Sequence, residues 1–324
     1  LGADAITEEN KVPAGLIEMS NGTQAPVFLD ARYLLGPEGA HMNISGISGL
    51  ATKTSYVMFL MQAVLQRYAD AANTAVILLN VKHDDLLHIH EPNDKLTEPA
   101  KLLWQALGLE PKPFPADSLH YLLPNGKFTA STGKPNSHAT PTIPYDVFAY
   151  ALGNTKDKLD LLLGHVPDQW DTMRALIGEI QNGLTAGGTK QNKWANVKTW
   201  SGLIDGPPLV DPTDGRAQQV GEVAAITVNR FRRILRRIVQ SRQSGIFVDQ
   251  LSRNHCDLAK KIADIKGGHT YVVDIYNLKD EEKTLVFGDI LRTIYQLYAE
   301  SDADDTEMPK RVIIFVDELN KYAP

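Results

Sequence analysis

The sequence predicts an α/β protein whose core is a parallel β-sheet. Two nearly continuous apolar runs, TAVILLNV at 74–81 and RVIIFV at 311–316, are typical of strands buried on both faces. Between residues 54 and 68, apolar side chains recur at helical spacing, so strand-like and helix-like segments alternate. With 324 residues, 43% of them hydrophobic and 22% charged, the chain is globular in composition and long enough for one large domain or two ordinary ones.

The N-terminal part of the chain is predicted to contain a β-hairpin followed by a βαβ unit. Residues 11–30 form two short strands joined at Asn21-Gly22, a strong tight-turn signal, and residues 31–40 connect them to the core. HMNIS at 41–45 is predicted to be a short strand that runs into a Gly-containing loop. A helix from Thr54 and the strand at 74–81 complete the unit.

The middle of the chain, residues 95–267, is expected to be a mostly helical insertion. Helical patterning covers 95–110, 146–184 and about 217–241, and a Pro/Ser/Thr-rich connector occupies 123–144. The sheet pattern resumes after Gly267-Gly268. We therefore expect a β segment at 1–40, a core made of 41–94 and 268–324, and the insertion at 95–267. The resumed core contains a strand at 269–275, a helix at 283–300 and a strand at 311–319.

The loop before the first core helix resembles a phosphate-binding loop. In such a loop, backbone N–H groups at a helix N-terminus converge on phosphate oxygens, a Lys adds positive charge, and a Ser/Thr hydroxyl binds Mg²⁺. Lys53 is seven positions after Gly46 instead of the usual six, and Thr52 stands where a Gly is usual. The residues expected to contact the nucleotide are Gly46, Gly49, Ala51, Thr52, Lys53, Thr54 and Ser55.

A second motif follows the last apolar run. Asp317 and Glu318 come directly after RVIIFV, at the carboxyl end of a predicted buried strand. In metal-dependent nucleotide hydrolysis, an Asp in this position orders the Mg²⁺ shell and a Glu polarises the attacking water. Either motif alone could be an ordinary strand-to-helix turn or a solvated strand end. Together they favour an ATP-hydrolysing enzyme of the P-loop NTPase (RecA-like) class, with ATP and Mg²⁺ as ligands.

With both motifs in place, the chain resembles the HerA-like ATPases of the HerA/FtsK superfamily, which are P-loop DNA translocases. The segment from Val12 to Tyr56 is similar to the junction between their small N-terminal β-barrel and the ATPase core. YVVDIYNL at 271–278, a Leu/Ile-rich helix and VIIFVDEL at 312–319 follow the order that leads to their acidic strand. The resemblance covers 11–94 and 268–324, about half of the chain, and does not extend to the insertion.

The resemblance implies a role for each motif residue. Lys53 and Glu318 would be catalytic, Thr54 and Asp317 would hold the metal ion, and residues 1–40 would be the end of the small barrel. It also implies a hexameric ring that couples ATP turnover to duplex DNA translocation or processing, with a nuclease or other effector partner, in DNA repair or antiviral defence. The alternative is a non-motor ring scaffold, with weak or absent nucleotide turnover, that organises an effector enzyme.

Two other groups of residues have open interpretations. His88 and His90, two apart in KHDDLLHIHEPND at 82–94, could bind a metal ion or could belong to a solvated loop. NRFRRILRRIVQSR at 229–242 predicts a basic amphipathic helix, which could contact DNA, form a subunit interface or be an exposed face paired with acidic neighbours.

Composition limits the cellular compartment and the kinds of partner that the protein can have. The single Cys256 rules out an internal disulfide and fits a cytoplasmic protein. No apolar run reaches the length that a bilayer requires, so we expect no membrane partner. The net charge of −6 argues against a protein coated in basic residues, although a local basic stripe would suffice for DNA. Because the chain begins with Leu1 and ends just after a strand-like run, we expect it to be part of a longer protein.

Overall fold

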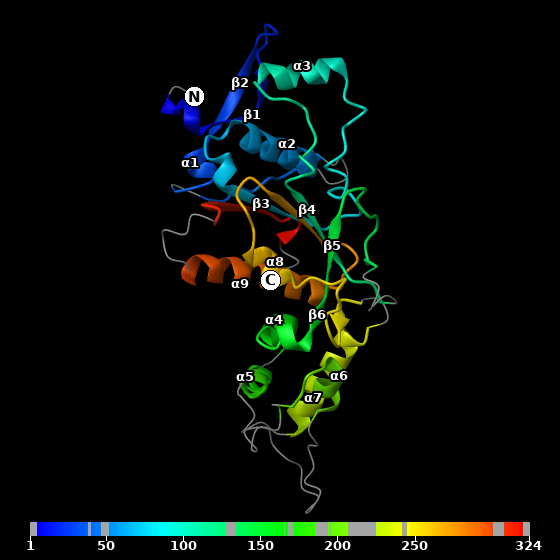
Figure 1. Cartoon of the computed structure of the whole chain (residues 1–324). Helices are drawn as coiled ribbons and strands as arrows, with labels where there is room; N and C mark the ends of the chain where they lie inside the picture. Colours follow the sequence, from blue (N-terminus) through cyan, green and yellow to red (C-terminus); the bar gives the residue numbers. More distant parts are fainter. Residues whose placement is uncertain are drawn as a thin grey trace, which may run out of the picture. The chain divides into compact units, whose positions relative to one another are not determined.

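The computed structural model confirms an α/β protein with a five-stranded sheet (Figure 1). It describes residues 5–37, 40–46, 52–127, 134–164, 166–167, 171–185, 194, 196–206, 225–241, 245–300 and 308–319. The chain forms two compact units. Unit 1 comprises Leu1–Tyr121, Ile265–Val273 and Asp302–Asp317, and unit 2 comprises Leu122–Asp264, Asp274–Ser301 and Glu318–Pro324.

The predicted N-terminal hairpin is confirmed. Strands β1 (Lys11–Glu18) and β2 (Gln24–Asp30) pair antiparallel around the Asn21-Gly22 turn, in which Gly22 has φ +80°. This positive φ explains why Gly occupies the turn. A 3₁₀ turn at Glu8–Asn10 precedes β1.

The connector after the hairpin contains a short helix, α1 (Ala31–Leu34), that the pattern did not predict. Asp30 caps it by accepting a hydrogen bond from the backbone N–H of Arg32, and its carboxylate also pairs with the Arg32 guanidinium at 2.6 Å. The strand predicted at 41–45 is wrong, because residues 40–46 form no regular structure. Most of this segment is exposed, and its apolar Met42 is 44% exposed, so no sheet buries it.

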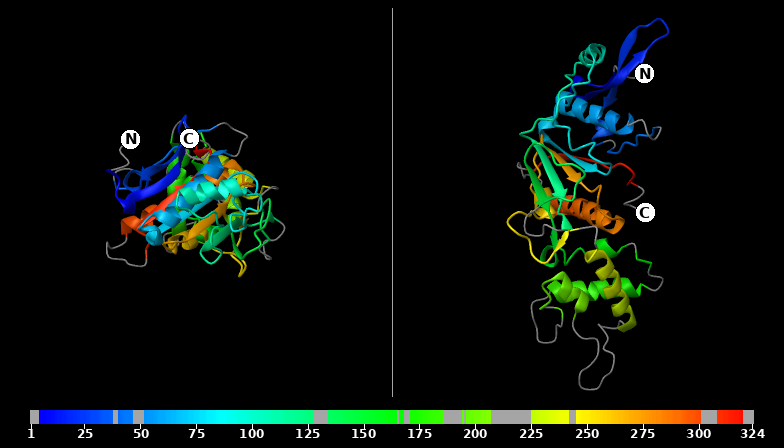
Figure 2. Two further views of the ribbon diagram at one scale, coloured as in Figure 1. Left: turned by 90° about the horizontal axis from the view of Figure 1, so that it is seen from above. Right: turned by 90° about the vertical axis from the view of Figure 1, so that its right-hand side faces the viewer.

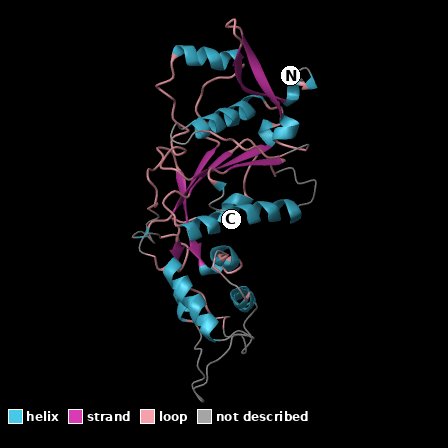
Figure 3. Cartoon of the chain, turned by 180° about the vertical axis from the view of Figure 1, so that it is seen from behind, coloured by secondary structure: helices cyan, strands magenta, loops and turns pink. Residues whose placement is uncertain are grey.

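Helix α2 (Thr52–Arg67) is the first core helix, as predicted from Thr54 onward. One of its faces packs against the hairpin: Ala63, Val64 and Tyr68 (just past its end) form a buried cluster with Val12. At its first turn, the Tyr56 hydroxyl donates to the backbone carbonyl of Ala14 at 3.0 Å. Figure 3, seen from behind, shows α2 alongside the long hairpin.

The central sheet has the strand order β5-β4-β8-β3-β9. Strand β3 (Thr74–Asn80) is buried along its whole length, as the apolar run predicted, and it pairs in parallel with β9 (Arg311–Phe315), an edge strand whose residues are half-buried. Asp70, just before β3, pairs with Arg311 at the start of β9 at 2.5 Å, which fixes where the two strands begin. Strand β8 (Thr270–Asp274) confirms the predicted 269–275 strand.

The range 95–267 differs from the mostly helical insertion that we expected, because two of its segments belong to the central sheet. These are β4 (Leu119–Pro124) and β5 (Tyr145–Phe148). A short segment such as Leu119–Leu123, which is apolar except for His120, cannot be distinguished from a piece of buried helix by periodicity, so neither strand was predicted. Helical patterning at 95–110 is confirmed by α3 (Glu98–Ala106), whose Thr97 cap accepts from the N–H of Ala100.

Unit 2 is built mainly from helices. Within it, the range 146–184 begins not with a helix but with β5 and with β6 (Tyr150–Ala151), which pairs in parallel with β7 (Phe247–Val248). Helix α9 (Asp280–Glu300) packs against both α4 (Leu159–Leu163) and α8 (Leu258–Ala263). The right-hand view of Figure 2 shows a second group, in which α7 (Ala225–Val239) contacts α5 (Thr172–Thr185) and α6 (Trp200–Asp205). Short 3₁₀ turns lie at Ala71–Asn73 in unit 1 and at Leu152–Asn154.

The approach to β8 depends on a glycine. A Cβ added to Gly267 would lie 2.9 Å from Cα of Asn73 and still closer to the carbonyl oxygen of Ala72, both of which are backbone atoms. We expect Gly267→Ala to lower the free energy of unfolding by about 1–3 kcal/mol, measured by urea denaturation, because the backbone must shift. Gly178→Ala on α5, where nothing lies within 4 Å, is the control and should be neutral or stabilising by about 0.5–1 kcal/mol. Equal stability of the two variants would contradict the close approach.

Candidate functional site

The N-terminus of α2 holds the predicted loop residues that the structure describes. Thr52 begins the helix, Lys53 and Thr54 are half-buried in its first turn, and Ser55 is exposed. The first N–H groups of a helix have no partner within the helix and carry partial positive charge, which favours an anion. Gly46 is exposed in the preceding segment, whereas Gly49 and Ala51 lie outside the described residues.

The structure brings Thr54 and Asp317 together, although they are more than 260 positions apart in the sequence. Both line one small cavity of about 10 Å³, with Asn80, Lys82 and Asp85 contributing further polar side chains. Leu79, Val81, Leu86 and Phe315 complete its lining. A cavity of this size holds about one water molecule or ion.

The register of the sheet explains this meeting. Leu78 on β3 is opposite Phe315 on β9, and the strands are parallel. The polar residues that come two positions later, Asn80 and Asp317, therefore emerge at the same carboxyl edge of the sheet. In open α/β sheets, ligands bind at this edge. The N-terminus of α2 lies at the same edge, because Thr54 shares the cavity with both residues.

Asp317 is already paired within the chain. Nζ of Lys82 lies 2.5 Å from its Oδ2, and the Asp317 side chain is only 13% exposed. The pair neutralises a carboxylate that would otherwise be mostly buried without a counter-charge. It also means that any cation at Asp317 must share this carboxylate with Lys82.

Both loops that leave this edge contain a residue with an unusual backbone conformation. Glu318 has φ +55° and His83 has φ +39°, a region that non-Gly residues seldom adopt. The bend at His83 is held by Asn80, whose Nδ2 donates to the His83 carbonyl at 2.8 Å. Strained residues of this kind concentrate at functional sites, and here each lies three positions after the end of a strand of the candidate site.

A larger cavity adjoins the small one. It has a volume of about 540 Å³ and shares Thr54 and Asp85 with the small cavity. Its walls include Phe59 and Trp104, whose rings meet edge to face at 5.2 Å. Its other polar side chains are Ser55, Gln62, His88, Glu91, Asn93 and Lys112. A concave surface with aromatic walls and a few polar groups is typical of small-molecule sites.

The two histidines considered as metal ligands have other partners. Nδ1 of His90 lies 2.8 Å from the Tyr121 hydroxyl, and burial lowers the pKa of His90. The His88 ring nitrogens lie 3.4 Å from an oxygen of Asp84 and 3.3 Å from an oxygen of Glu91. Within the described residues, no group of three or more His, Cys, Asp or Glu side chains is placed to hold a metal ion.

The predicted basic helix is α7. Three of its arginines contact other residues of unit 2. Arg230 donates to the carbonyl of Pro167 at 2.6 Å, Arg236 pairs with Asp205 at 3.2 Å and Arg237 pairs with Glu281 at 3.0 Å. Its buried face is apolar, with Phe231 and Leu235 fully buried. These contacts favour the interpretation of an exposed face paired with acidic neighbours.

Sequence reasoning missed Asn80, Lys82 and Asp85 as members of the site. The signal was present, because Asn80 lies near the end of the 74–81 run and Lys82 and Asp85 follow it, just as Asp317 follows the 311–316 run. Their role became visible only once β3 and β9 were paired.

A scan against protein-family models finds no match to this chain, and a search of curated proteins finds no similar sequence. No helix in the described part of the chain is long and apolar enough to span a membrane.

Proposed function

We propose that this chain binds and hydrolyses ATP at the carboxyl edge of its sheet, as a P-loop NTPase. The observation that supports this most directly is the shared cavity of Thr54, in the first turn of α2, and Asp317, which follows β9. A hydroxyl at a helix N-terminus next to a carboxylate at a strand end is the arrangement that nucleotide hydrolysis requires.

Each residue has a distinct role in the proposal. The N–H groups that open α2 and the ammonium group of Lys53 bind the phosphates and neutralise negative charge that develops during hydrolysis. Glu318 orients the attacking water and accepts hydrogen bonding from it. Asp85 and the aromatic-walled cavity beside Thr54 border the site on one side.

The residues present fit a Mg²⁺ ion. Protein sites for this ion supply one or two oxygen ligands and leave the rest to water and substrate phosphates, and Thr54 and Asp317 would hold it here. When bound, the ion supplies positive charge to the phosphate oxygens. Lys82 would then move from Asp317 or share its carboxylate.

The wider proposal is that turnover drives duplex DNA translocation or processing by a cytoplasmic, hexameric HerA-like ring, with a nuclease or other effector as partner. Antiviral defence or DNA repair is the proposed setting. The support for this part is the sequence resemblance over 11–94 and 268–324.

In unit 2, burial raises the pKa of Cys256 to about 12, which keeps the thiol protonated and unreactive.

Replacement of Lys53 tests the nucleotide site. We expect Lys53→Ala to weaken ATP binding about 10- to 100-fold in isothermal titration calorimetry, because a charge-assisted contact to the phosphates is lost. Lys101→Ala on α3, an exposed lysine paired with Glu98, is the control and should bind ATP as the native protein does. Equal ATP affinity in Lys53→Ala and the native chain would overturn the proposed phosphate site.

A non-motor ring scaffold is the second candidate. The 2.5 Å ion pair between Lys82 and Asp317 favours it, because this pair occupies the carboxylate that a metal ion would need. We expect Lys82→Met to raise Mg²⁺-dependent ATP binding if the pair is the obstacle. Absence of turnover in both the native chain and Lys82→Met, with and without duplex DNA, would favour the scaffold.

A further inference from the structure

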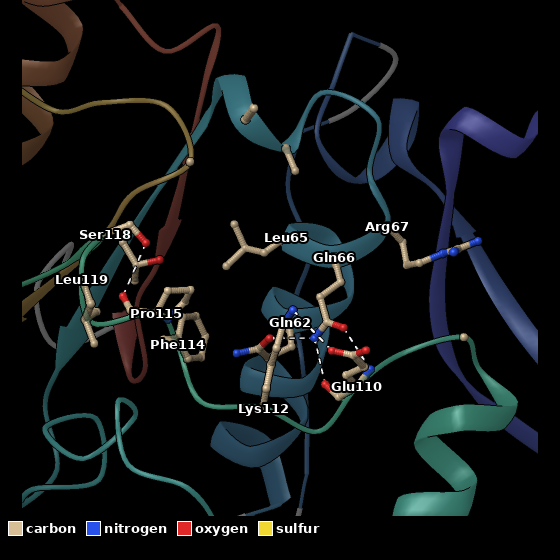
Figure 4. A pocket seen from close by; sticks show the side chains of 15 residues that line it. Gln62, Leu65, Gln66, Arg67, Glu110, Lys112, Phe114, Pro115, Ser118 and Leu119 are labelled. Carbon is tan, nitrogen blue, oxygen red and sulfur yellow. Dashed lines mark hydrogen bonds and ion pairs between the residues drawn. The ribbon is translucent and has the colours of Figure 1, made fainter.

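Helix α2 borders a second large cavity, far along the helix from Lys53 and Thr54. This cavity has a volume of about 550 Å³ and is lined by the C-terminal half of α2, the 108–119 segment and the start of β8 (Figure 4). Gln62 is eight positions from Thr54, which is about 12 Å along a helix. Thr54 and Asp317 do not line this cavity, but Gln62, Lys112 and Phe114 also line the cavity beside Thr54, so the two cavities adjoin.

The polar wall of the cavity is held in place by a hydrogen-bonded frame. Gln66 donates to Oε1 of Gln62 and to the backbone carbonyl of Glu110, and it accepts from the Glu110 N–H, all at 2.9 Å. In Figure 4 the Gln62 side chain lies between Gln66 on one side and Phe114 and Pro115 on the other. A ligand would therefore meet a preorganised surface.

This frame leaves hydrogen-bond donors directed to the cavity. Gln62 is 6% exposed; its side-chain oxygen accepts from Gln66, and its amide nitrogen has no partner among the described residues. Thr270, which is 3% exposed, also lines the cavity, and its side-chain hydroxyl has no hydrogen-bond partner among the described residues. Both residues line the cavity, so a ligand or water within it would supply the acceptors for their donors.

The charges around the cavity favour an anion. Lys112 lines it, and its only described ion pair is a long one, 3.6 Å to Glu110, between two exposed side chains. Glu110 is the only acidic residue among the lining side chains, and it is 78% exposed, so water screens it. Arg67 also lines the cavity, but its side chain points away from Gln62 (Figure 4).

The rest of the lining is apolar. Leu65, Phe114, Pro115 and Leu119 surround the polar groups, and Phe114 and Leu119 are each 4% exposed. A volume of this size and an apolar wall with a few fixed donors match a small-molecule site. We propose that the cavity binds a small organic anion, with an apolar body against Phe114 and a carboxylate or phosphate group at Lys112 and the Gln62 amide.

The binding of three simple probes to the full chain tests this. Phenyl phosphate carries a phosphate group and benzoate a carboxylate group, each on an apolar ring. Benzyl alcohol has the same ring without a charge and is the control. We expect at least one anion to bind saturably at millimolar concentration and about tenfold more tightly than benzyl alcohol, because a charge-assisted hydrogen bond is added. Failure of both anions to bind, or equal affinity for benzyl alcohol, would overturn the proposal.

Variants place the probe in this cavity. Lys112→Met should weaken anion binding about tenfold and Thr270→Val severalfold, while Lys101→Met on α3 should leave it unchanged. Because Gln62, Lys112 and Phe114 also line the cavity next to Thr54, whereas Thr270 does not, Thr270→Val distinguishes the two cavities. In NMR spectra, the backbone amides of Gly268 and Thr270 should shift while the indole N–H of Trp104 does not. Shifts confined to Trp104, or full binding in Thr270→Val, would place the anion elsewhere.

The Lys53→Ala variant distinguishes anion binding in this cavity from ATP binding at the N-terminus of α2. Anion binding in the cavity should be unchanged in Lys53→Ala, whatever that substitution does to ATP. Loss of phenyl phosphate binding in Lys53→Ala would locate the anion at the N-terminus of α2 and overturn the second site.

Discussion

Glu318→Gln is expected to lower ATP turnover at least about 100-fold while leaving ATP affinity within about twofold of the native value. A carboxylate can hold the attacking water and accept its proton, whereas an amide of the same shape cannot. The substitution is suited to this position because Glu318 has φ +55°. Gln and Glu have the same backbone freedom, so the strained turn after Asp317 is preserved.

The measurement is steady-state phosphate release together with equilibrium ATP binding, each with and without duplex DNA. Glu98→Gln on α3, whose side chain is 80% exposed, is a matched control and should turn over ATP like the native chain. Native turnover in Glu318→Gln would remove Glu318 from the proposed mechanism. DNA-stimulated turnover in the native chain, lost in the variant, would support the motor over the scaffold.

Asp289→Ala is expected to lower the free energy of unfolding by about 3–5 kcal/mol, the largest stability effect that we predict. Asp289 on α9 is 1% exposed and pairs with Lys158, which is 9% exposed, at 2.7 Å. Its second oxygen accepts from the buried Tyr150 hydroxyl at 3.0 Å. Removal of the carboxylate leaves a buried ammonium group and a buried hydroxyl without their acceptor.

Burial dominates the electrostatics of this group. It raises the pKa of Asp289, and Lys158 and the Tyr150 hydroxyl offset only part of the effect. The carboxylate therefore does not stabilise the fold by itself. The stability lost in Asp289→Ala arises because Lys158 and the Tyr150 hydroxyl stay buried without an acceptor.

A double-mutant comparison tests that explanation. Lys158→Met combined with Asp289→Leu removes both charges and keeps apolar volume, so it should recover most of the stability lost in Asp289→Ala. Tyr150→Phe alone should cost about 1–2 kcal/mol, because it removes one hydrogen bond. Urea denaturation of the native chain and of these three variants gives the free energies of unfolding to be compared. If the double variant is as unstable as Asp289→Ala, the loss arises from packing and not from an unpaired charge.

Local patterns predicted the elements whose signals lie within one stretch of chain. The apolar run at 74–81 became the fully buried β3, helical spacing from Thr54 became α2, and Asn21-Gly22 became the hairpin turn. Where the local signal was short or ambiguous, prediction failed. The strand expected at 41–45 is an exposed segment, and β4 and β5 joined the sheet from a range that we expected to be mostly helical.

The chain by itself therefore determined the fold class and named Lys53, Thr54, Asp317 and Glu318 as candidates, because residue type and spacing are local properties. Only the tertiary structure decided which of these meet. The parallel register of β3 and β9 brings Asp317 to Lys82 and to the cavity of Thr54 across more than 230 positions of sequence. The cavity lined by the C-terminal half of α2 and the Lys158–Asp289 pair also depend on tertiary packing. Each is formed by segments distant in the chain, and packing of those segments, which no local pattern encodes, places their polar groups together.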